Sequence, residues 1–310
     1  MTDISRRSFL LGATATFAVG NGCVTMQKTV DDNLTVFLAD LHVRNAKSYQ
    51  YRFFAGMVED ILAMNPRPKR AVVFGDLAYL CGLKSEYETS RRLLDRLLDA
   101  GMELTIGMGN HDRRSAFLDV WPEYRTRTLV PGKIVTSTNL GAVDLLMLDG
   151  LQGSDERAAD DMGPVDGKLD AGQQEWLYDY LAKLKRPTIL ASHFPISDMC
   201  GTGRRLVSRL RDYPGVVGYI YGHKHRWDPH WVQYGWGMNK FLRYLCLPST
   251  GHWGDIGYVT FRTSEHKAEA RFVQKDFFFC APVASGTSRP QAWDDILEER
   301  GRSPVCTFRY

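Results

Sequence analysis

The stretch GMGNHDRR, residues 107–114, decides the fold because it places polar side chains directly behind a short apolar run. The preceding MELTIGM, residues 102–108, is typical of a buried strand. Asn and Asp are poor residues inside helices and strands, because their side chains compete with the backbone for hydrogen bonds. Such a segment is most often an Asx-type turn. At the end of a strand in a layered α/β fold, however, the same residues are candidates for catalysis.

The segments on either side alternate between strand and helix patterns, which predicts an α/β fold. Strands are expected at 34–40, 70–76, 102–110, 141–150, 187–193 and 216–223, and helices at 51–65, 86–101, 172–185 and 204–213. From residue 241 to 279 strand follows strand, which predicts a hairpin-rich second sheet. We expect one domain over residues 33–280, and then a C-terminal tail at 281–310 with one short helix.

Length, net charge and cysteine spacing each bear on the class of protein. A chain of 310 residues can bury a substantial core. Its formal net charge of +3, with both signs mixed throughout, argues against a dedicated nucleic-acid surface. Apart from Cys23, five cysteines remain, an odd number without C-x-x-C spacing, so no thiolate zinc site is predicted.

The N-terminal residues 1–22 have the features of a signal peptide. Arg6 and Arg7 precede an apolar stretch that is too short to span a bilayer. The pattern resembles a twin-arginine export signal, which implies a periplasmic or other extracytoplasmic protein. A chance arginine pair on an amphipathic helix is the alternative. Cleavage fits after residues 18–20 (AVG), and a lipid anchor at Cys23 is a second option.

Groups that can bind a metal ion follow five of the expected strands. They are Asp40 and His42, Asp76, Asn110 with His111 and Asp112, His193, and His223 with His225. One histidine in such a position is more often structural. Five of the chain's eight histidines together with carboxylates, all at the same kind of position, indicate a metal site instead.

The donors are sufficient for two ions. Asp40, His42, Asp76 and His225 could hold one, and Asp76, Asn110, His193 and His223 the other, with Asp76 as the bridge. Mixed carboxylate and imidazole ligands suit Mn²⁺, Fe, Zn²⁺ or Ni²⁺ better than Ca²⁺, which prefers oxygen alone. Two divalent ions roughly 3.5–4 Å apart form the clamp with which many enzymes hydrolyse phosphate esters.

The order of these motifs, D-x-H, G-D, G-N-H-D, H and G-H-x-H, resembles the calcineurin-like metallophosphoesterase superfamily. The resemblance implies a four-layer α/β/β/α sandwich of two mixed β-sheets flanked by helices. It also implies the ligand assignment given above, and it makes His111 a catalytic residue that acts on the substrate.

The resemblance also suggests roles for the neighbours of His111. The His111 ring would stabilise the transferred phosphoryl group or protonate the leaving oxygen. Asp112 would hold that ring in its useful tautomer. Gly109 would supply backbone freedom. Arg113 or Arg114 could contact substrate phosphate, although a solvated position is expected for at least one of them.

Tyr79 and three further histidines are the remaining candidates. Tyr79 occupies the position of the iron-binding tyrosine of the purple acid phosphatase branch. That branch lacks the first-motif histidine, whereas His42 is present here, so we expect Tyr79 to lie near the site without binding metal. His252 could line the site or be structural, as could His230 and His266.

The function expected from the sequence is an exported, two-metal-dependent phosphoesterase. It would hydrolyse a small-molecule phosphate ester by direct attack of a metal-bound hydroxide, with phosphomonoesters favoured. A cyclic-nucleotide or other phosphodiesterase is the alternative, and a catalytically silent scaffold or a nuclease is disfavoured. No integral membrane span and no nucleic-acid partner are expected. The oligomeric state, the native metals and the disulfide pairing are left open.

Overall fold

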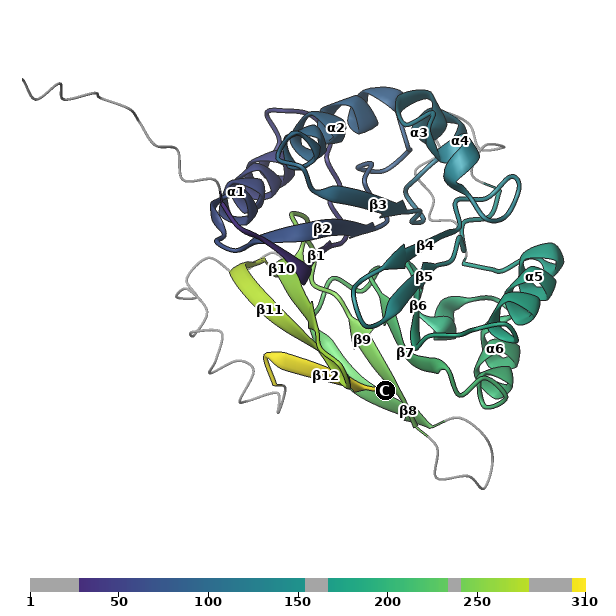
Figure 1. Cartoon of the computed structure of the whole chain (residues 1–310). Helices are drawn as coiled ribbons and strands as arrows, with labels where there is room; N and C mark the ends of the chain where they lie inside the picture. The colour runs from purple at the N-terminus through teal and green to yellow at the C-terminus, as the bar shows by residue number, and fades with distance from the viewer. Residues whose placement is uncertain (1–27, 154–166, 234–240, 279–302) are drawn as a thin grey trace, which may run out of the picture.

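The computed structural model describes residues 28–153, 167–233, 241–278 and 303–310 as two β-sheets that face each other (Figure 1). The first sheet has the strand order β12-β11-β10-β1-β2-β3 and the second β4-β5-β6-β7-β9-β8. The strands of the first sheet are β1 (Val30–Leu38), β2 (Arg67–Phe74), β3 (Glu103–Gly107), β10 (Gly254–Thr263), β11 (Lys267–Phe278) and β12 (Val305–Arg309). Those of the second are β4 (Thr136–Asn139), β5 (Asp144–Met147), β6 (Thr188–Ser192), β7 (Val216–Tyr221), β8 (Asp228–Gln233) and β9 (Phe241–Cys246). The predicted signal peptide and Cys23 lie outside the described residues.

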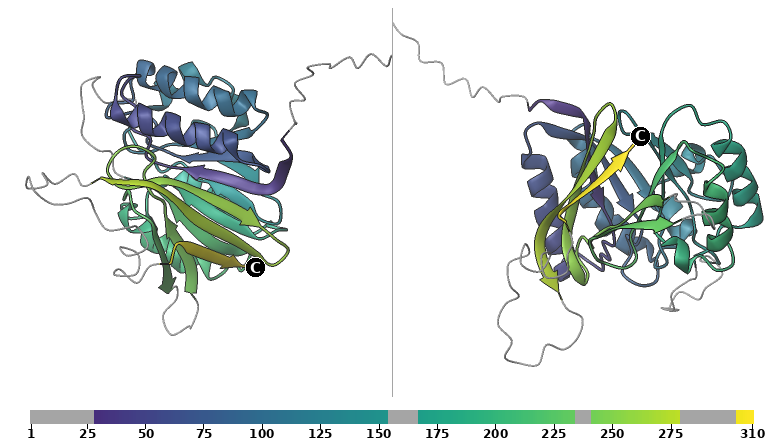
Figure 2. Two further views of the ribbon diagram at one scale, coloured as in Figure 1. Left: turned by 90° about the vertical axis from the view of Figure 1, so that its left-hand side faces the viewer. Right: turned by 90° about the horizontal axis from the view of Figure 1, so that it is seen from below.

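Helices cover the outer face of each sheet. Those over the first sheet are α1 (Tyr49–Ala63), α2 (Lys84–Asp99), α3 (Arg114–Val120) and α4 (Tyr124–Arg127). Those over the second are α5 (Ala171–Leu181), the 3₁₀ helix η1 (Ile196–Asp198) and α6 (Gly203–Leu210). The right-hand view of Figure 2 shows the order helix, sheet, sheet, helix. The fold is therefore the α/β sandwich of two mixed, helix-flanked sheets that the sequence predicts.

The central strands bury side chains on both of their faces, which explains their uninterrupted apolar sequences. In β1, Val36 and Leu38 join the core under α1 and α2, whereas Phe37 joins the core between the two sheets. In β5, Leu145 lies between the sheets, and Leu146 packs under α5 and α6. Three apolar cores thus separate the four layers.

The direction of the strands brings the loops of the predicted site together. β1, β2 and β3 are parallel neighbours in the first sheet, and β5, β6 and β7 are parallel neighbours in the second. The carboxyl ends of parallel strands meet at one edge of a sheet, which is where α/β folds place their ligands. The loops after β1, β2, β3, β6 and β7 are the ones that carry the candidate residues.

The late strands differ from the sequence prediction, because they do not form a sheet of their own. β10 pairs antiparallel with β1 and carries β11 into the first sheet, whereas β8 and β9 extend the second sheet beside β7. The β10 pairing buries Phe261 against Phe37 between the sheets. The first sheet thus gains antiparallel strands, whereas the second sheet gains the parallel strand β9 and the antiparallel strand β8.

The last residues of the predicted tail also join the first sheet. β12 pairs antiparallel with β11 and buries Cys306 and Phe308 between the sheets. The short helix predicted within residues 292–300 lies outside the described residues.

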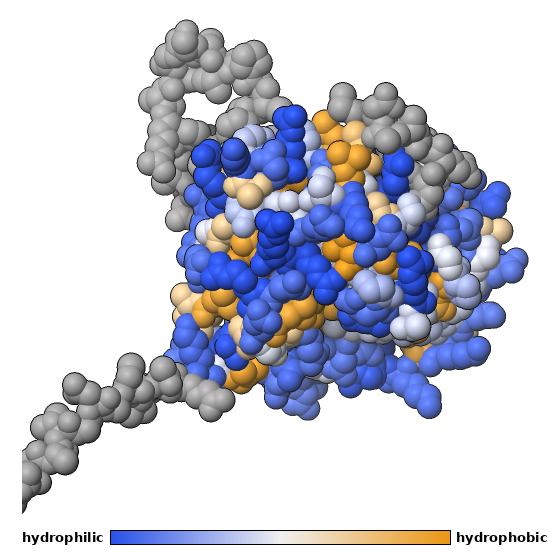
Figure 3. All heavy atoms as spheres, turned by 90° about the horizontal axis from the view of Figure 1, so that it is seen from above, coloured by the Kyte–Doolittle hydropathy of each residue, from blue (hydrophilic) through white to orange (hydrophobic). Residues whose placement is uncertain are grey.

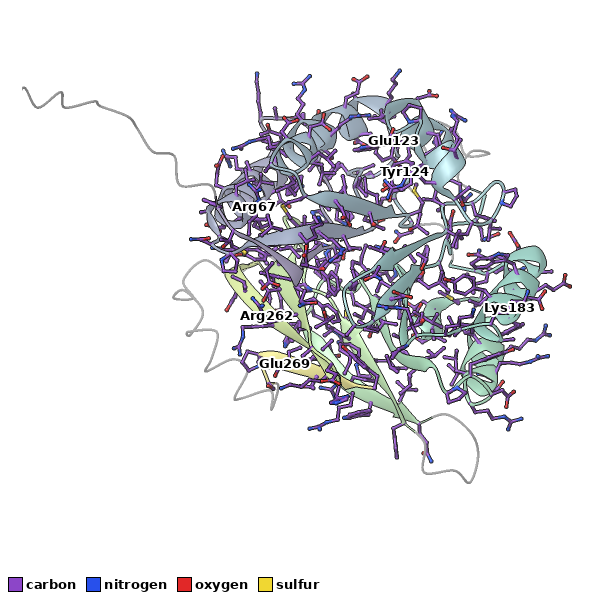
Figure 4. All side chains as sticks on the ribbon, viewed as in Figure 1. Arg67, Glu123, Tyr124, Lys183, Arg262 and Glu269 are labelled. Atoms are coloured by element: carbon purple, nitrogen blue, oxygen red, sulfur yellow. The ribbon has the colours of Figure 1, made fainter. Side chains whose placement is uncertain are left out.

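Polar residues cover much of the outer surface. The face seen from above is mostly hydrophilic with scattered apolar side chains (Figure 3). On the first sheet, Arg262 of β10 lies directly opposite Glu269 of β11, a favourable pairing of opposite charges (Figure 4). Among the helices that the structure describes, none is long and apolar enough to cross a membrane.

Candidate metal centre

The candidate ligands lie in the short loops that directly follow five strands. Most of them have an unusual backbone conformation. Among the described residues, the non-glycine residues with positive φ are Asp40 (53°), His42 (46°), Asp76 (51°), His223 (68°) and His225 (50°). Non-glycine residues rarely adopt this left-handed conformation, and it is concentrated at functional sites. The loops are therefore shaped to point these side chains at one another.

The first group of donors forms a tight, buried cluster. The ligand atoms of Asp40, His42, Asp76 and His225 all lie within 4.8 Å of one another. His225 Nε2 lies 3.1 Å from Asp40 Oδ1, and His42 Nε2 lies 3.4 Å from Asp76 Oδ2. The two imidazole Nε2 atoms are 3.3 Å apart. This is the same set that the sequence assigns to one ion.

The second group lies on the other side of Asp76. Asn110 Oδ1 lies 2.9 Å from His193 Nε2 and 2.8 Å from His223 Nδ1. His193 Nε2 is also 3.2 Å from Asp76 Oδ2, the oxygen that faces His42. Asp76 is therefore shared by the two groups, as the sequence predicts for a bridging ligand.

Backbone carbonyls fix the tautomers of three of these histidines. The Nδ1 atoms of His42, His193 and His225 face the carbonyl oxygens of Tyr79 (3.0 Å), Phe74 (2.9 Å) and Trp253 (3.2 Å). A carbonyl can only accept, so each Nδ1 carries a proton and each Nε2 is the ring nitrogen that faces the cluster. His223 is reversed, with Nδ1 facing the cluster and Nε2 3.6 Å from Asp198 Oδ2. Such outer contacts are typical of metal-binding histidines.

Glycines allow the loops to approach this closely. A Cβ added to Gly109 would lie 2.1 Å from Asp76 Oδ1, and one added to Gly222 would lie 2.8 Å from Asp40 Oδ2. The added Cβ of Gly75, whose φ is +86°, would meet the backbone of Gly109 at 2.6 Å. Gly109 is not among the glycines with positive φ, so its small size, rather than the expected backbone freedom, is what this position requires.

The pKa values of this cluster are shifted because two buried carboxylates lie among imidazoles. Burial raises the pKa of Asp76, but His193 and His111 outweigh it and hold the pKa well below its usual range. Burial lowers the pKa of His193, yet the Asp76 and Asp40 carboxylates raise it to about 9. Burial and the neighbouring His193 lower the pKa of His223 to about 4. The cluster therefore holds anionic carboxylates beside a protonated His193 and a neutral His223.

This donor set fits divalent cations. Asp40 and Asp76 are 0% and 1% exposed, and imidazoles are their side-chain partners. A protonated His193 balances one of these two buried carboxylate charges, and the other is costly to leave uncompensated. Mixed N and O donors of this kind suit Mn²⁺, Fe, Zn²⁺ or Ni²⁺.

The backbone amide of His111 and its ring both contact this site. The amide donates a 2.8 Å hydrogen bond to Asp76 Oδ1, and the ring centroid lies 5.0 Å from that of His42. His111 Nδ1 faces the Leu80 carbonyl at 3.1 Å, which fixes the tautomer and presents Nε2 as an acceptor or, when protonated, a donor. The Leu80 carbonyl thus has the ring-orienting role that the sequence prediction gave to Asp112.

Asp112 holds the loops in place. Its Oδ2 accepts hydrogen bonds from the amides of Asp76 and Gly109, both at 2.8 Å. Its Oδ1 accepts from the amides of Leu77 and Ala78 and from the Tyr87 hydroxyl. Burial and the Asp76 charge raise the pKa of Asp112 to about 6. Asp112 is therefore a positioning residue that ties the loop after β2 to the loop after β3.

The two arginines after Asp112 differ in their surroundings. Arg114 forms a bidentate pair with the buried Asp149, with Nε–Oδ2 at 2.7 Å and Nη2–Oδ1 at 2.8 Å. This commits Arg114 to the protein interior rather than to substrate. Arg113 is partly buried at the start of α3, and its amide donates to the Tyr87 hydroxyl.

Two aromatic residues line the site beside His42. The Tyr79 carbonyl accepts a hydrogen bond from His42 Nδ1. The centroid of the Tyr79 ring lies 5.8 Å from that of His252 and 5.6 Å from the Arg44 guanidinium. The His252 ring lies 4.4 Å from that of His42, and its Nδ1 is 3.2 Å from the Tyr49 hydroxyl. His252 thus lines the site, whereas His266 is largely exposed at a distant turn and His230 lies on β8.

A comparison with known protein families supports the interpretation of this cluster as a metal centre. Residues 34–227 match the family model described as calcineurin-like phosphoesterase. The chain belongs to the calcineurin-like phosphoesterase family. It is accordingly a metal-dependent phosphoric ester hydrolase. A search of curated proteins finds no match to the chain.

Solved structures of low sequence identity share the fold. A dimetal phosphatase from Danio rerio is 12% identical, with a TM-score of 0.59 over 77% of this chain and 95% of that one. A purple acid phosphatase from yellow lupin (Lupinus luteus) seeds is 14% identical, with a TM-score of 0.58 over 89% of this chain and 53% of that one. At these identities the likeness establishes the fold of this phosphoesterase and nothing finer.

Proposed function

We propose that this phosphoesterase hydrolyses a small phosphate ester at a two-metal centre, by direct attack of water on phosphorus. The observation that supports this proposal is the shared position of Asp76 between two groups of donors, with His111 beside both. When bound, the two ions would supply the charge that neutralises phosphate oxygens and lowers the pKa of water.

The chain's own residues would then position and protonate the substrate. His111 is held by its amide to Asp76 and by its Nδ1 to the Leu80 carbonyl, so Nε2 is the ring atom left to act on substrate. A protonated Nε2 can donate to a phosphoryl oxygen or give its proton to the leaving oxygen. Asp112 keeps the two loops in register while this happens.

Phosphomonoesters are the favoured substrates of this proposal, and diesters such as cyclic nucleotides are the alternative. Two structural neighbours are described as phosphatases, which supports the order of preference. The native ions are proposed from the donor chemistry, which accepts Mn, Fe, Zn or Ni.

The test is hydrolysis of p-nitrophenyl phosphate against bis-p-nitrophenyl phosphate by the protein reconstituted with Mn²⁺, beside an Asp76→Asn variant. The proposal expects monoester turnover that disappears in the variant. Faster diester turnover would favour the alternative. A metal-loaded protein that turns over neither ester in an Asp76-dependent way would contradict the proposal and favour a silent scaffold.

We further propose that residues 1–22 direct export, since Arg6 and Arg7 precede a short apolar stretch. Replacing both arginines by lysine should leave the protein inside the cell in a fractionation experiment. Unchanged export of the variant would argue against a twin-arginine signal. Retention of a covalent lipid on Cys23 would identify the lipid-anchored form.

A further inference from the structure

A groove of about 1090 Å³ lies on the outer face of the second sheet. Its walls are the segment 195–201 with α6 on one side and β7, β8 and β9 on the other. Neither the seven candidate ligands nor His111 line it. Its volume is slightly above the roughly 300–1,000 Å³ that is typical of sites that enclose organic ligands.

Aromatic rings line this groove on the side of the sheet. The rings of His230 and Tyr244 are stacked, with centroids 5.6 Å apart and an angle of 27° between planes. The Tyr221 ring meets His230 edge-on at 6.3 Å. Ile196, Met199 and Val207 face them from the opposite wall. Such a surface accepts a planar apolar group.

One polar atom in this aromatic surface lacks a partner. Tyr244 is 4% exposed, and its hydroxyl is buried without a hydrogen-bond partner among the described residues. The neighbouring Tyr219 hydroxyl, by contrast, donates to the Phe194 carbonyl at 2.7 Å. Buried hydroxyls in native proteins almost always have a partner, so the Tyr244 hydroxyl, whose side chain lines the groove, can still donate one hydrogen bond.

The charged side chains that line the groove are basic. Arg204 and Arg211 contribute guanidinium groups, and the residues that line the groove include no Asp or Glu. Arg211 Nε lies 3.3 Å from Asp212 in an exposed pair, whereas no ion pair of Arg204 occurs among the described residues. A guanidinium can donate two parallel hydrogen bonds to a carboxylate, sulfonate or phosphate.

From the cavity, the orphan hydroxyl and the arginines, we propose that this groove binds a small organic anion with a planar apolar body. The apolar body lies against Tyr221, His230 and Tyr244. The anionic group lies at Arg204. A hydrogen-bond acceptor of the ligand takes the Tyr244 hydroxyl. This site is additional to the phosphoesterase centre and does not depend on the substrate proposed above.

The test uses 8-anilinonaphthalene-1-sulfonate, an anion with a planar naphthalene body whose fluorescence rises on binding, with the purified metal-loaded protein. We expect one bound dye per chain. Arg204→Gln should raise the Kd at least tenfold, because a charge-assisted contact is lost. Tyr244→Phe, which removes only the hydroxyl, should raise it about threefold to tenfold. The uncharged N-phenyl-1-naphthylamine should bind at least tenfold more weakly than the sulfonate.

The matched control is Arg205→Gln, an exposed arginine of the same helix that does not line the groove. It should bind the dye as wild type does, and all three variants should keep wild-type turnover of p-nitrophenyl phosphate. Three results would each overturn the proposal: no stoichiometric binding, equal losses in the Arg204 and Arg205 variants, or displacement of the dye by inorganic phosphate that is equal in wild type and Arg204→Gln. The last result would place the dye at the metal centre.

Discussion

Five of the seven candidate metal ligands have a strained backbone conformation. Asp40, His42, Asp76, His223 and His225 all have positive φ, a conformation that costs a non-glycine residue about 1–3 kcal/mol. Such conformations persist only where the surroundings determine them, here through the close approach of Gly75, Gly109 and Gly222. These conformations lower the stability locally, but they bring the donor atoms of the candidate ligands together.

At His111 we predict a loss of catalysis without a loss of metal. His111→Gln should lower kcat for p-nitrophenyl phosphate by about 10²–10³-fold, because the proton donor to the phosphoryl group or leaving oxygen is removed. The metal content per chain should stay at the wild-type value, measured by inductively coupled plasma mass spectrometry. A variant that loses its metal would show instead that His111 is a ligand.

At Gly109 we predict that one added methyl group disrupts the site. Its Cβ would lie 2.1 Å from Asp76 Oδ1, so Gly109→Ala should displace Asp76 and lower both the metal affinity and the unfolding temperature. The control is Gly56→Ala in α1, where no atom lies within 4 Å of the added Cβ. That variant should gain about 0.5–1 kcal/mol in denaturant unfolding. Wild-type metal binding by Gly109→Ala would refute the steric argument.

At the scale of elements, buried polar contacts hold the site loops against the layers behind them. Arg114 at the start of α3 pairs with Asp149, which follows β5. The Asp149 carboxylate also accepts from the amide of Ile134, and its backbone bonds the Gln173 side chain in α5. This network connects the loop of His111 in the first sheet to the second sheet and its helices.

Removing one partner of the buried Arg114–Asp149 pair should lower the free energy of unfolding. Asp149→Asn leaves the Arg114 guanidinium without its counter-charge, and we predict a loss of about 3–5 kcal/mol in the free energy of unfolding by urea. The matched control is Asp212→Asn, which breaks the exposed pair with Arg211 and should cost under about 1 kcal/mol. Equal effects of the two substitutions would contradict the structural role of Asp149.

The first turn of α2 should give the protein a measurable pH dependence. Burial raises the pKa of Glu86 to about 7, while its carboxylate accepts from the Leu83 amide at 3.1 Å. A folded-state pKa above the unfolded value of 4.5 means that this group favours the folded state below pH 4.5 and loses that contribution as the pH rises to 7.

Glu86→Gln keeps the capping acceptor but cannot ionise. Its free energy of unfolding relative to wild type should therefore increase between pH 4.5 and 7, by about 1–2 kcal/mol. Chemical unfolding at several pH values measures this difference. A difference that is constant with pH would contradict the raised pKa.

At the scale of the whole molecule, the sequence predicts the layers better than the sheet membership of its late strands. Apolar runs such as residues 70–74 are recognisable because both faces of a central strand are buried. Nothing local specifies that β10 pairs with β1, since Phe37 and Val259, for example, are far apart in the chain, or that β12 closes the same sheet. These pairings depend on Phe261 and Phe308 meeting the intersheet core.

In the candidate site, too, some features are predictable from the sequence and others are not. The donors from Asp40 to His225 are recognisable because their residue types recur at strand ends. The acceptor of His111 Nδ1 is a backbone carbonyl, that of Leu80, which leaves no trace in residue type. The Arg114–Asp149 pair is equally hidden, because a charge on a helix is usually solvated.

The central claim is a two-metal centre bridged by Asp76, and metal stoichiometry tests it most directly. Apo-protein prepared with a chelator would be reconstituted with Mn²⁺, desalted and analysed by inductively coupled plasma mass spectrometry, beside Asp76→Asn. We predict two ions per chain for wild type and a loss of at least one for the variant. A wild-type protein that binds a single ion, or a variant that keeps two, would contradict the account.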